Sequence, residues 1–256
     1  MSKLFVSRRT RAAAWVILLV LPALMAAFGY YHSHRPAVNP VGSRTFWDYV
    51  ILNSDILLGL LFLLASAIPF ILVFDKRRPQ ARELVPIAVM AAIAVVGRTV
   101  FEIIPLPNFK PCSAIIIITA VAFGPEAGFL TGALTAFVSN FIFGQGPWTP
   151  WQMFAMGAIG WLAGILYRKG VLRRSKLSLC IFGVIASTVI YGGIMNPASA
   201  LMWAQSVNWK IILSYYISGI PVDLVRAIAT FFFLWLGAEP MLEKLDRIKT
   251  KYGLAE

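Results

Sequence analysis

The fold is decided by the stretch from Phe123 to Gly164, which reads FGPEAGFLTGALTAFVSNFIFGQGPWTPWQMFAMGAIGWLAG. It predicts two apolar helices joined by a turn of Gly, Pro and Trp. Small residues recur every four positions along the first helix and share one face, where another helix can approach closely: Gly124, Gly128, Gly132, Ala136 and then Asn140. A second, polar stripe on the same helix consists of Thr131, Thr135 and Ser139.

The turn between these helices closes with Thr149-Pro150-Trp151-Gln152. This order predicts a capping box, in which Thr149 is the N-cap, Pro150 takes the first helical position and Gln152 reaches back. A plain helical hairpin in a membrane bundle would account for these features. A loop shaped by Gly and Pro and flanked by tryptophans is also a reasonable place for a ligand to bind.

The composition indicates a membrane protein. Hydrophobic residues make up 59% of the chain and charged residues 13%, which is roughly half the charged fraction of a soluble domain. A helix of about 20 apolar residues spans a bilayer, and the sequence contains eight candidate spans: residues 12–31, 49–74, 84–104, 111–123, 126–143, 151–168, 177–197 and 211–236. We therefore predict an all-α polytopic membrane protein.

The distribution of Lys and Arg predicts the orientation. If the N-terminus is inside, seventeen of the 23 basic residues lie in inner segments and four in outer ones, while Arg98 and Arg226 lie within spans. Because cytoplasmic loops retain positive charge, both termini are expected to be cytoplasmic, in a prokaryotic plasma membrane. The net charge of +12 is then explained by inner loops that face anionic lipid, without any nucleic acid partner.

The chain divides into four segments on this interpretation. Residues 1–75 form an N-terminal extension with two transmembrane helices, because the first apolar run is too long for a signal peptide. Residues 76–83 form a basic linker. Residues 84–238 form a six-helix core, and residues 239–256 form a charged cytoplasmic tail. The two cysteines lie near opposite ends of their spans and are expected to be too far apart for a disulfide. His32 and His34 have no third ligand nearby that a metal site would need.

Ionisable residues within a bilayer are costly and usually face protein or water. Arg98 and Glu102 are four apart in one span, and Asp223 and Arg226 are three apart near the middle of another. At about 1.5 Å per residue, Arg98 and Asp55 lie at similar depths, and we expect them to face one another or to share a water. A fixed ion pair and a substrate contact stay open for Arg98. Asp223 and Arg226 are expected to satisfy one another in part and to hold the bundle together, with a coupling or substrate role as the alternative.

Several catalytic motifs are absent from the sequence. It contains no GxxxxGK[ST] phosphate loop, no HExxH and no GxSxG, so an ATPase of that type, a zinc protease and a serine hydrolase lack their chemistry. The core shows no duplicated half, which weakens the case for a transporter built from inverted repeats. The fourth span has only thirteen residues, or about 20 Å, and suggests a cavity or a thinned membrane above it.

The core, about residues 82–237, resembles the substrate-binding S component of energy-coupling factor (ECF) transporters. Ala88-Val89-Met90-Ala91-Ala92 is similar to the family's AxxxA contact motif. The short span after a Pro-containing loop and the helix GPEAGFLTGALTAF also match, and GQGPWTPWQM leading into AMGAIGWLAG is the most specific feature. The two additional N-terminal spans depart from the six-helix pattern, and we assign them no function.

The resemblance implies a division of labour. An S component captures a vitamin at the outer face with no cofactor of its own. It then docks on a membrane T component with two cytosolic ATPases, which use the ATP, and topples to release the substrate inside. Carried over by position, Ala88, Ala91 and Ala92 would meet the T component. The outer loops at 105–111, 143–151 and 198–210 would gate and line the site. Their aromatic and amide side chains, with those beside them, are the candidate substrate-binding residues: Asn108, Phe109, Trp148, Trp151, Gln152, Asn196, Trp203, Asn208 and Tyr215.

The identity of the substrate does not follow from these residues. The Trp-rich third outer loop resembles members assigned to corrinoids, so we prefer cobalamin, while another vitamin or a nucleoside is nearly as consistent. Two other classes stay open: an autonomous transporter or channel, and a polytopic membrane enzyme that uses Asp223 and Arg226.

Overall fold

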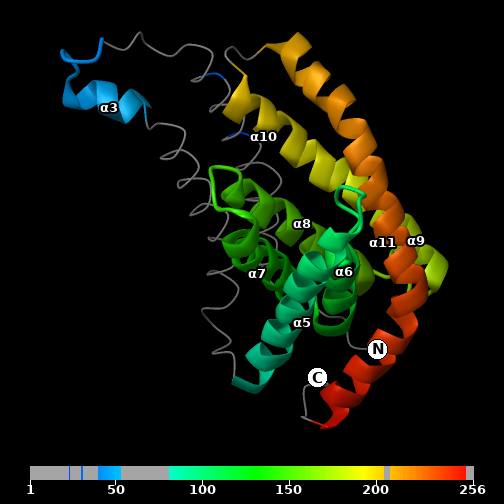
Figure 1. Ribbon diagram of the computed structural model, residues 1–256. Helices are drawn as coiled ribbons and strands as arrows, with labels where there is room; N and C mark the ends of the chain where they lie inside the picture. The colour runs from blue at the N-terminus through cyan, green and yellow to red at the C-terminus, as the bar shows by residue number, and fades with distance from the viewer. Residues whose placement is uncertain (1–22, 24–29, 31–39, 53–80, 205–207, 252–256) are drawn as a thin grey trace.

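The computed structural model describes residues 23, 30, 40–52, 81–204 and 208–251. The predictions for Asp55, for the first span, for most of the second span and for most of the basic linker lie outside these residues. All regular elements of the described part are helices, and they follow in the order α3 (Phe46–Leu52), α5 (Ala81–Val100), η2 (Phe101–Ile103), α6 (Cys112–Phe123), α7 (Pro125–Phe143), α8 (Thr149–Arg168), α9 (Lys176–Ile185), η3 (Ala186–Gly192), α10 (Gly193–Trp203) and α11 (Trp209–Lys251) (Figure 1).

Four of the described helical segments are long and apolar enough to cross a membrane. They are Leu84–Ile103, Pro125–Phe143, Lys176–Trp203 and Trp209–Lys251. The six spans expected in the core correspond to α5, α6, α7, α8, the run α9–η3–α10, and α11. The fold is thus that of an all-α polytopic membrane protein, as the sequence predicts.

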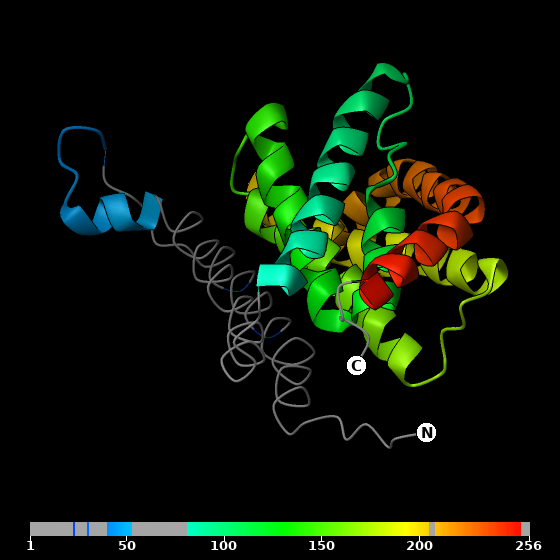
Figure 2. The same cartoon turned by 90° about the horizontal axis from the view of Figure 1, so that it is seen from below.

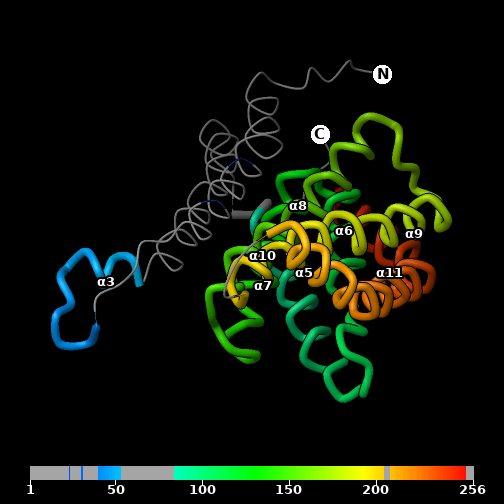
Figure 3. Tube along the Cα trace, turned by 90° about the horizontal axis from the view of Figure 1, so that it is seen from above, coloured from blue at the N-terminus to red at the C-terminus, as the bar shows by residue number. Residues whose placement is uncertain are grey.

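The short helix α6 lies at the centre of the bundle. Every residue from Cys112 to Ala122 is buried, and α6 contacts α5, α7, α8 and α11 (Figure 3). A helix that is apolar on all sides is typically buried in this way. Its length is about 18 Å, and its neighbours surround it. The cavity or thinned membrane that this length suggests stays a prediction.

Glycines bring α7 and α8 into close contact. A Cβ atom added at Gly160 would lie 2.3 Å from the carbonyl oxygen of Gly128, and one added at Gly132 would lie 2.4 Å from that of Met156. Real Cβ atoms do not approach backbone oxygens so closely, so these positions require glycine in the present packing. The small-residue face of the first helix, predicted to admit another helix, therefore packs against the GAIG segment of the second.

The helix after the basic loop 169–175 runs further than expected. It was predicted to stop at Asn196-Pro197, but α9, the π-helical segment η3 and α10 continue to Trp203. Pro197 cannot donate to the carbonyl oxygen of Gly193, four residues earlier. The hydroxyl of Tyr216 donates to that oxygen instead, over 3.0 Å. A side chain from α11 thus satisfies the acceptor that the proline leaves free, and the helix can continue.

The last helix, α11, extends along the whole bundle (Figure 1). Most of the charged tail expected over residues 239–256 continues this helix, since α11 runs to Lys251 and Leu242 and Leu245 are buried. The ammonium group of Lys249 donates to the carbonyl oxygen of Ala122, in the last turn of α6, over 2.8 Å. Residues 239–251 are therefore a continuation of the packed helix α11.

We name the two ends of the bundle by their side chains. The aromatic end carries Trp148, Trp203 and Trp209 and the loop 104–111. The basic end carries the loop 169–175 and the end of α11. Ion pairs at the basic end join Arg174 to Asp246, and Lys176 to Glu239 at 3.0 Å.

Candidate functional site

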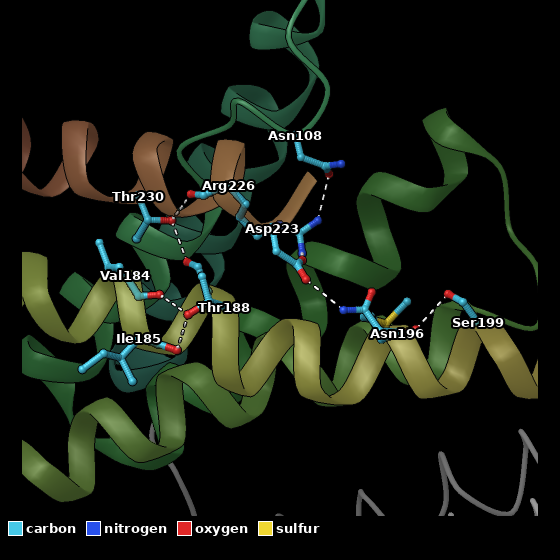
Figure 4. Close-up of polar contacts among 11 residues, drawn as sticks. Asn108, Val184, Ile185, Thr188, Asn196, Ser199, Asp223, Arg226 and Thr230 are labelled. Atoms are coloured by element: carbon cyan, nitrogen blue, oxygen red, sulfur yellow. Dashed lines mark hydrogen bonds and ion pairs between the residues drawn. The ribbon is translucent and has the colours of Figure 1, made fainter. Parts of the chain in front are cut away.

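Four polar side chains meet near the aromatic end, where α10 crosses α11. We call Asn108, Asn196, Asp223 and Arg226 the polar cluster (Figure 4). Arg226 Nη2 donates to Asn108 Oδ1 over 2.9 Å, and Asn196 Nδ2 donates to Asp223 Oδ2 over 2.9 Å. The cluster brings together two predicted substrate-binding residues and the two charges predicted in the last span.

Two glycines leave space for this cluster, and one aromatic ring packs against it. A Cβ atom added at Gly192 would lie 2.4 Å from Asp223 Oδ2, and one at Gly219 would lie 2.4 Å from Asn196 Oδ1. The buried ring of Tyr191, in η3, lies 3.5 Å from the guanidinium carbon of Arg226. Such a cation–π contact stabilises a partly desolvated arginine by about 2 kcal/mol. The π-helical segment thus places Tyr191 and Gly192 against the two charged side chains.

The ion pair leaves hydrogen-bonding capacity unused. Arg226 Nη1 and Asp223 Oδ1 are 3.8 Å apart, and the two side chains are 11% and 13% exposed. This distance is too long for a hydrogen bond. Among the described residues Arg226 Nη1 is buried without a hydrogen-bond partner, and no hydrogen bond of the described residues uses Asp223 Oδ1. The prediction that the pair is satisfied in part is confirmed, and a donor and an acceptor remain side by side.

A second polar network, on α5, α7 and α8, replaces the predicted capping box. The N-cap of α8 is Trp148, with helical backbone angles and no capping hydrogen bond from its side chain. Thr149 and Gln152 instead both accept hydrogen bonds from Asn140 Nδ2, over 3.0 and 2.9 Å. The box prediction was wrong because a buried amide on α7 competes for the same two side chains.

Arg98 takes part in this second network. Its Nη1 donates to Ser139 Oγ and, over 2.9 Å, to Asn140 Oδ1. Glu102, four residues after Arg98, does not pair with it. Glu102 lies in η2, outside the α-helical register, and forms its ion pair with Lys110. Arg98 and Lys110 both contact the ring of Phe143, at 4.7 and 4.5 Å from its centroid.

The predicted aromatic residues separate into two groups. Trp148 and Trp203 contact one another at the aromatic end, with their ring centroids 6.1 Å apart. Trp151 is buried in an apolar cluster with Phe154 and Trp161. Phe109 packs against the rings of two residues on α11, Phe232 and Phe233. Trp151 and Phe109 therefore belong to the packing of the bundle in this structure.

The remaining predicted substrate residues lie apart from the polar cluster. Asn208 is exposed and caps α11, since its Oδ1 accepts from the amide of Ile211 over 3.0 Å. Gln152 belongs to the second network. The expected outer loop 198–210 is helical up to Trp203, with Ala198, Ala200 and Leu201 buried, so less of it is available to gate a site than we expected.

Sequence reasoning missed two tyrosines of the site. Tyr216, and not Tyr215, reaches α10 through its hydroxyl. Tyr216 precedes Asp223 by seven residues, a spacing that places both on one helical face and would have identified it. Tyr191 carries no such signal, because its position depends on the π-helical turn in η3.

The proposed partner surface is exposed only in part. Ala88 and Ala92 lie on an exposed, apolar face of α5 with Val85, Val89 and Ile93, whereas Ala91 is buried. The opposite side of α5 packs against α6 and α7 (Figure 2). Because Ala91 faces the bundle, we remove it from the candidate surface. Within the described residues no three His, Cys, Asp or Glu side chains are close enough to hold a metal ion.

Comparisons with known proteins bear on the polar cluster and on the exposed face of α5. Residues 79–237 match the family model of the ECF-type riboflavin transporter, S component. The chain is 26% identical over 126 residues to a UPF0397 protein of Vibrio atlanticus, covering 47% of this chain and 69% of that protein. It is 28% identical over 123 residues to a UPF0397 protein of Clostridium perfringens, covering 46% of this chain and 65% of the relative. The chain thus spans about two thirds of the length of these relatives.

No solved structure matches the chain. The family match covers α5 to α11 up to residue 237 and includes both the polar cluster and the exposed face of α5. A match over more than half of the chain shows the family. The chain therefore belongs to the ECF-type riboflavin transporter S components.

Proposed function

We propose that this membrane protein, a substrate-binding subunit of an ECF transporter, captures a flavin-like planar vitamin at the aromatic end, with riboflavin as the first candidate. The observation that carries the proposal is the unused donor and acceptor of the polar cluster, Arg226 Nη1 and Asp223 Oδ1. A ligand with a neighbouring carbonyl and N–H could bind both atoms at once. The imide edge of an isoalloxazine ring has this pattern.

The surroundings of the pair support a ligand of this kind. Asn108 and Asn196 hold the two charged side chains through one hydrogen bond each, which leaves the second oxygen of Asp223 and the second terminal nitrogen of Arg226 for a ligand. Hydrogen bonds to charged groups contribute about 1.5–3 kcal/mol each. A buried donor without a partner is costly, and a ligand carbonyl would remove that cost.

The preference for a corrinoid rests on the resemblance of the Trp-rich third outer loop to members assigned to that class. Residues 198–203 of that loop belong to the packed helix α10. The name of the matching family favours a flavin. We therefore place riboflavin before cobalamin and keep cobalamin as the second ligand to test.

We further propose that transport depends on a T component and two ATPases that dock on this chain. Ala88 and Ala92 would form the contact, since small exposed residues four apart let another helix approach closely. The sequence contains no phosphate loop, so ATP hydrolysis is assigned to the partner subunits. Both termini are proposed to face the cytoplasm, with the basic end inside.

The engagement of Asp223 and Arg226 argues against the enzyme alternative. Each of them binds an asparagine and lies beside the other, an arrangement suited to hold a ligand edge and not to move a proton. No observation favours an autonomous transporter over the subunit.

Two measurements on the tagged, full-length chain test the proposal. Purification from its host should recover a T component and two ATPases, and mass spectrometry should find a flavin bound to the purified chain. Recovery of cobalamin would keep the subunit and replace the substrate. A chain that never brings down partners, and that accumulates a vitamin alone in liposomes, would refute the assignment.

A further inference from the structure

Asn140, one of the most buried polar residues of the described part, joins three segments of the chain. Its side chain is 1% exposed. An asparagine amide has two N–H donors and one oxygen acceptor. Here the oxygen and both N–H groups are hydrogen-bonded. The oxygen accepts from Arg98 on α5, and the two N–H groups face Thr149 and Gln152 on α8. The amide can have only this orientation, because arginine has no acceptor to offer.

Thr149 carries the connection into the loop 144–148. Its hydroxyl donates to Gln145 Oε1 over 2.9 Å and accepts from the amide of Gly146 over 3.3 Å. The amide group of Gln145 in turn donates to the carbonyl oxygen of Phe137 over 2.9 Å. The side chains of Asn140 and Thr149 therefore help to hold the loop that presents Trp148 to Trp203.

Arg98 connects the conformation of the loop 144–148 to the position of α5. It reaches the network from the side of α5 that faces α7, whereas Ala88 and Ala92 lie on the exposed side of the same helix. Helices are stiff over such distances, so a shift or tilt of α5 moves the guanidinium with it. Because the guanidinium is bound to Ser139 and Asn140, that shift acts on the contacts of the loop.

We propose that Arg98 and Asn140 are positioning residues that couple docking on α5 to the loop 144–148. Docking of a partner helix on Ala88 and Ala92 displaces α5, and the Arg98–Asn140–Thr149 connection changes how tightly the loop is held. Arg98 thus acts through the loop and makes no contact with the substrate. This inference rests on the proposed function, since it needs the docked partner.

Hydrogen–deuterium exchange tests the connection without knowledge of the substrate. The rate of the Gly146 amide is measured by mass spectrometry in the full-length chain alone and in its complex with the T component and ATPases. In the wild type, docking should change this rate several-fold. In Arg98→Met the loop contacts to Asn140 and Thr149 remain, but docking should leave the rate unchanged. Thr149→Val interrupts the same connection at its other end and should have the same effect if Arg98→Met does not fold.

Thr99→Val is the matched control. Thr99 is next to Arg98, and its hydroxyl donates only to Val95 of the same helix, so this variant should keep the wild-type response. An unchanged Gly146 rate on docking of the wild type, or a full response in Arg98→Met and Thr149→Val, would overturn the inference alone. Failure of the wild type to form the complex would overturn the proposed function with it.

Discussion

Arg226 on α11 donates a hydrogen bond to Asn108, which lies 118 residues earlier in the chain, in the loop before α6. The same guanidinium lies over the ring of Tyr191 and beside Asp223. One side chain thereby joins the last helix to the loop 104–111 and to the π-helical segment. The loop is fixed at Asn108 by a backbone with a φ of 65°, a left-handed conformation that asparagine adopts more readily than most residues.

Removal of one charge from the polar cluster should destabilise the protein more than removal of both. Arg226→Gln leaves Asp223 nearly buried with only Asn196 as a partner, and loss of one member of a buried pair costs about 3–5 kcal/mol. The double variant Asp223→Asn, Arg226→Gln leaves no unpaired charge and should recover much of this loss. Thermal unfolding in the same detergent measures the difference. A double variant that is less stable than Arg226→Gln would contradict this account of the pair.

The contact between α7 and α8 predicts a strong effect of a single methyl group. Gly160→Ala would place a Cβ atom 2.3 Å from the carbonyl oxygen of Gly128, so the hairpin must open at an overpacking cost of about 1–3 kcal/mol. Gly237→Ala on α11 is the control, since its Cβ would meet only Met241 Sδ at 3.9 Å. Alanine is favoured over glycine within a helix by roughly 0.5–1 kcal/mol, so this control should be neutral or stabilising. Equal melting temperatures of the two variants would rule out the close packing.

Much of this fold follows from the sequence alone. Apolar runs and basic loops predict the membrane class, and the four-residue spacing of Gly128 and Gly132 predicts the tight hairpin that the structure contains. These features are local, so periodicity reveals them. The local contact that failed is overridden by a side chain from the preceding helix: Asn140 on α7 binds Thr149 and Gln152 in place of the capping box.

The site itself was predicted in part. Asn108, Asn196, Asp223 and Arg226 were each selected for their residue type. The spacing of three residues predicts that Asp223 and Arg226 meet, but no spacing predicts that the two asparagines join them. Their contact depends on the π-helical turn and on glycines at 192 and 219 that admit side chains from the facing helix. A π-helical turn has no clear sequence signature, so the position of Tyr191 could not be derived.

Docking on α5 predicts that transport and substrate binding can be separated. Ala88→Trp places a large side chain on the exposed face of α5 and should prevent assembly with the T component while leaving riboflavin binding unchanged. The control is Val189→Trp, because Val189 in η3 is also exposed and apolar but lies on another helix. Uptake assays and pull-downs measure the two effects. Loss of uptake in both variants, or loss of binding in Ala88→Trp, would show that the interface assignment is wrong.

The proposed orientation predicts which loops react from outside the cell. Cys112 and Cys180 are both buried, so introduced cysteines give the main signal. A membrane-impermeant maleimide applied to intact cells should label Lys210→Cys at the aromatic end and should spare Lys169→Cys at the basic end until the cells are opened. Both positions are exposed. Labelling of Lys169→Cys alone in intact cells would invert the topology.

The central claim is that the polar cluster binds the substrate, and a fluorescence titration tests it most directly. Riboflavin is added to the purified chain in lipid nanodiscs, and the quenching of its fluorescence is followed, with cobalamin as a competitor. We predict saturable binding of one riboflavin per chain. Loss of hydrogen bonds to two charged groups, at about 1.5–3 kcal/mol each, weakens binding by about 100-fold or more, so the Asp223→Asn, Arg226→Gln variant should bind at least that much more weakly while still folded. Saturable binding that is unchanged in this variant, or no binding of either vitamin to the wild type, would contradict the account.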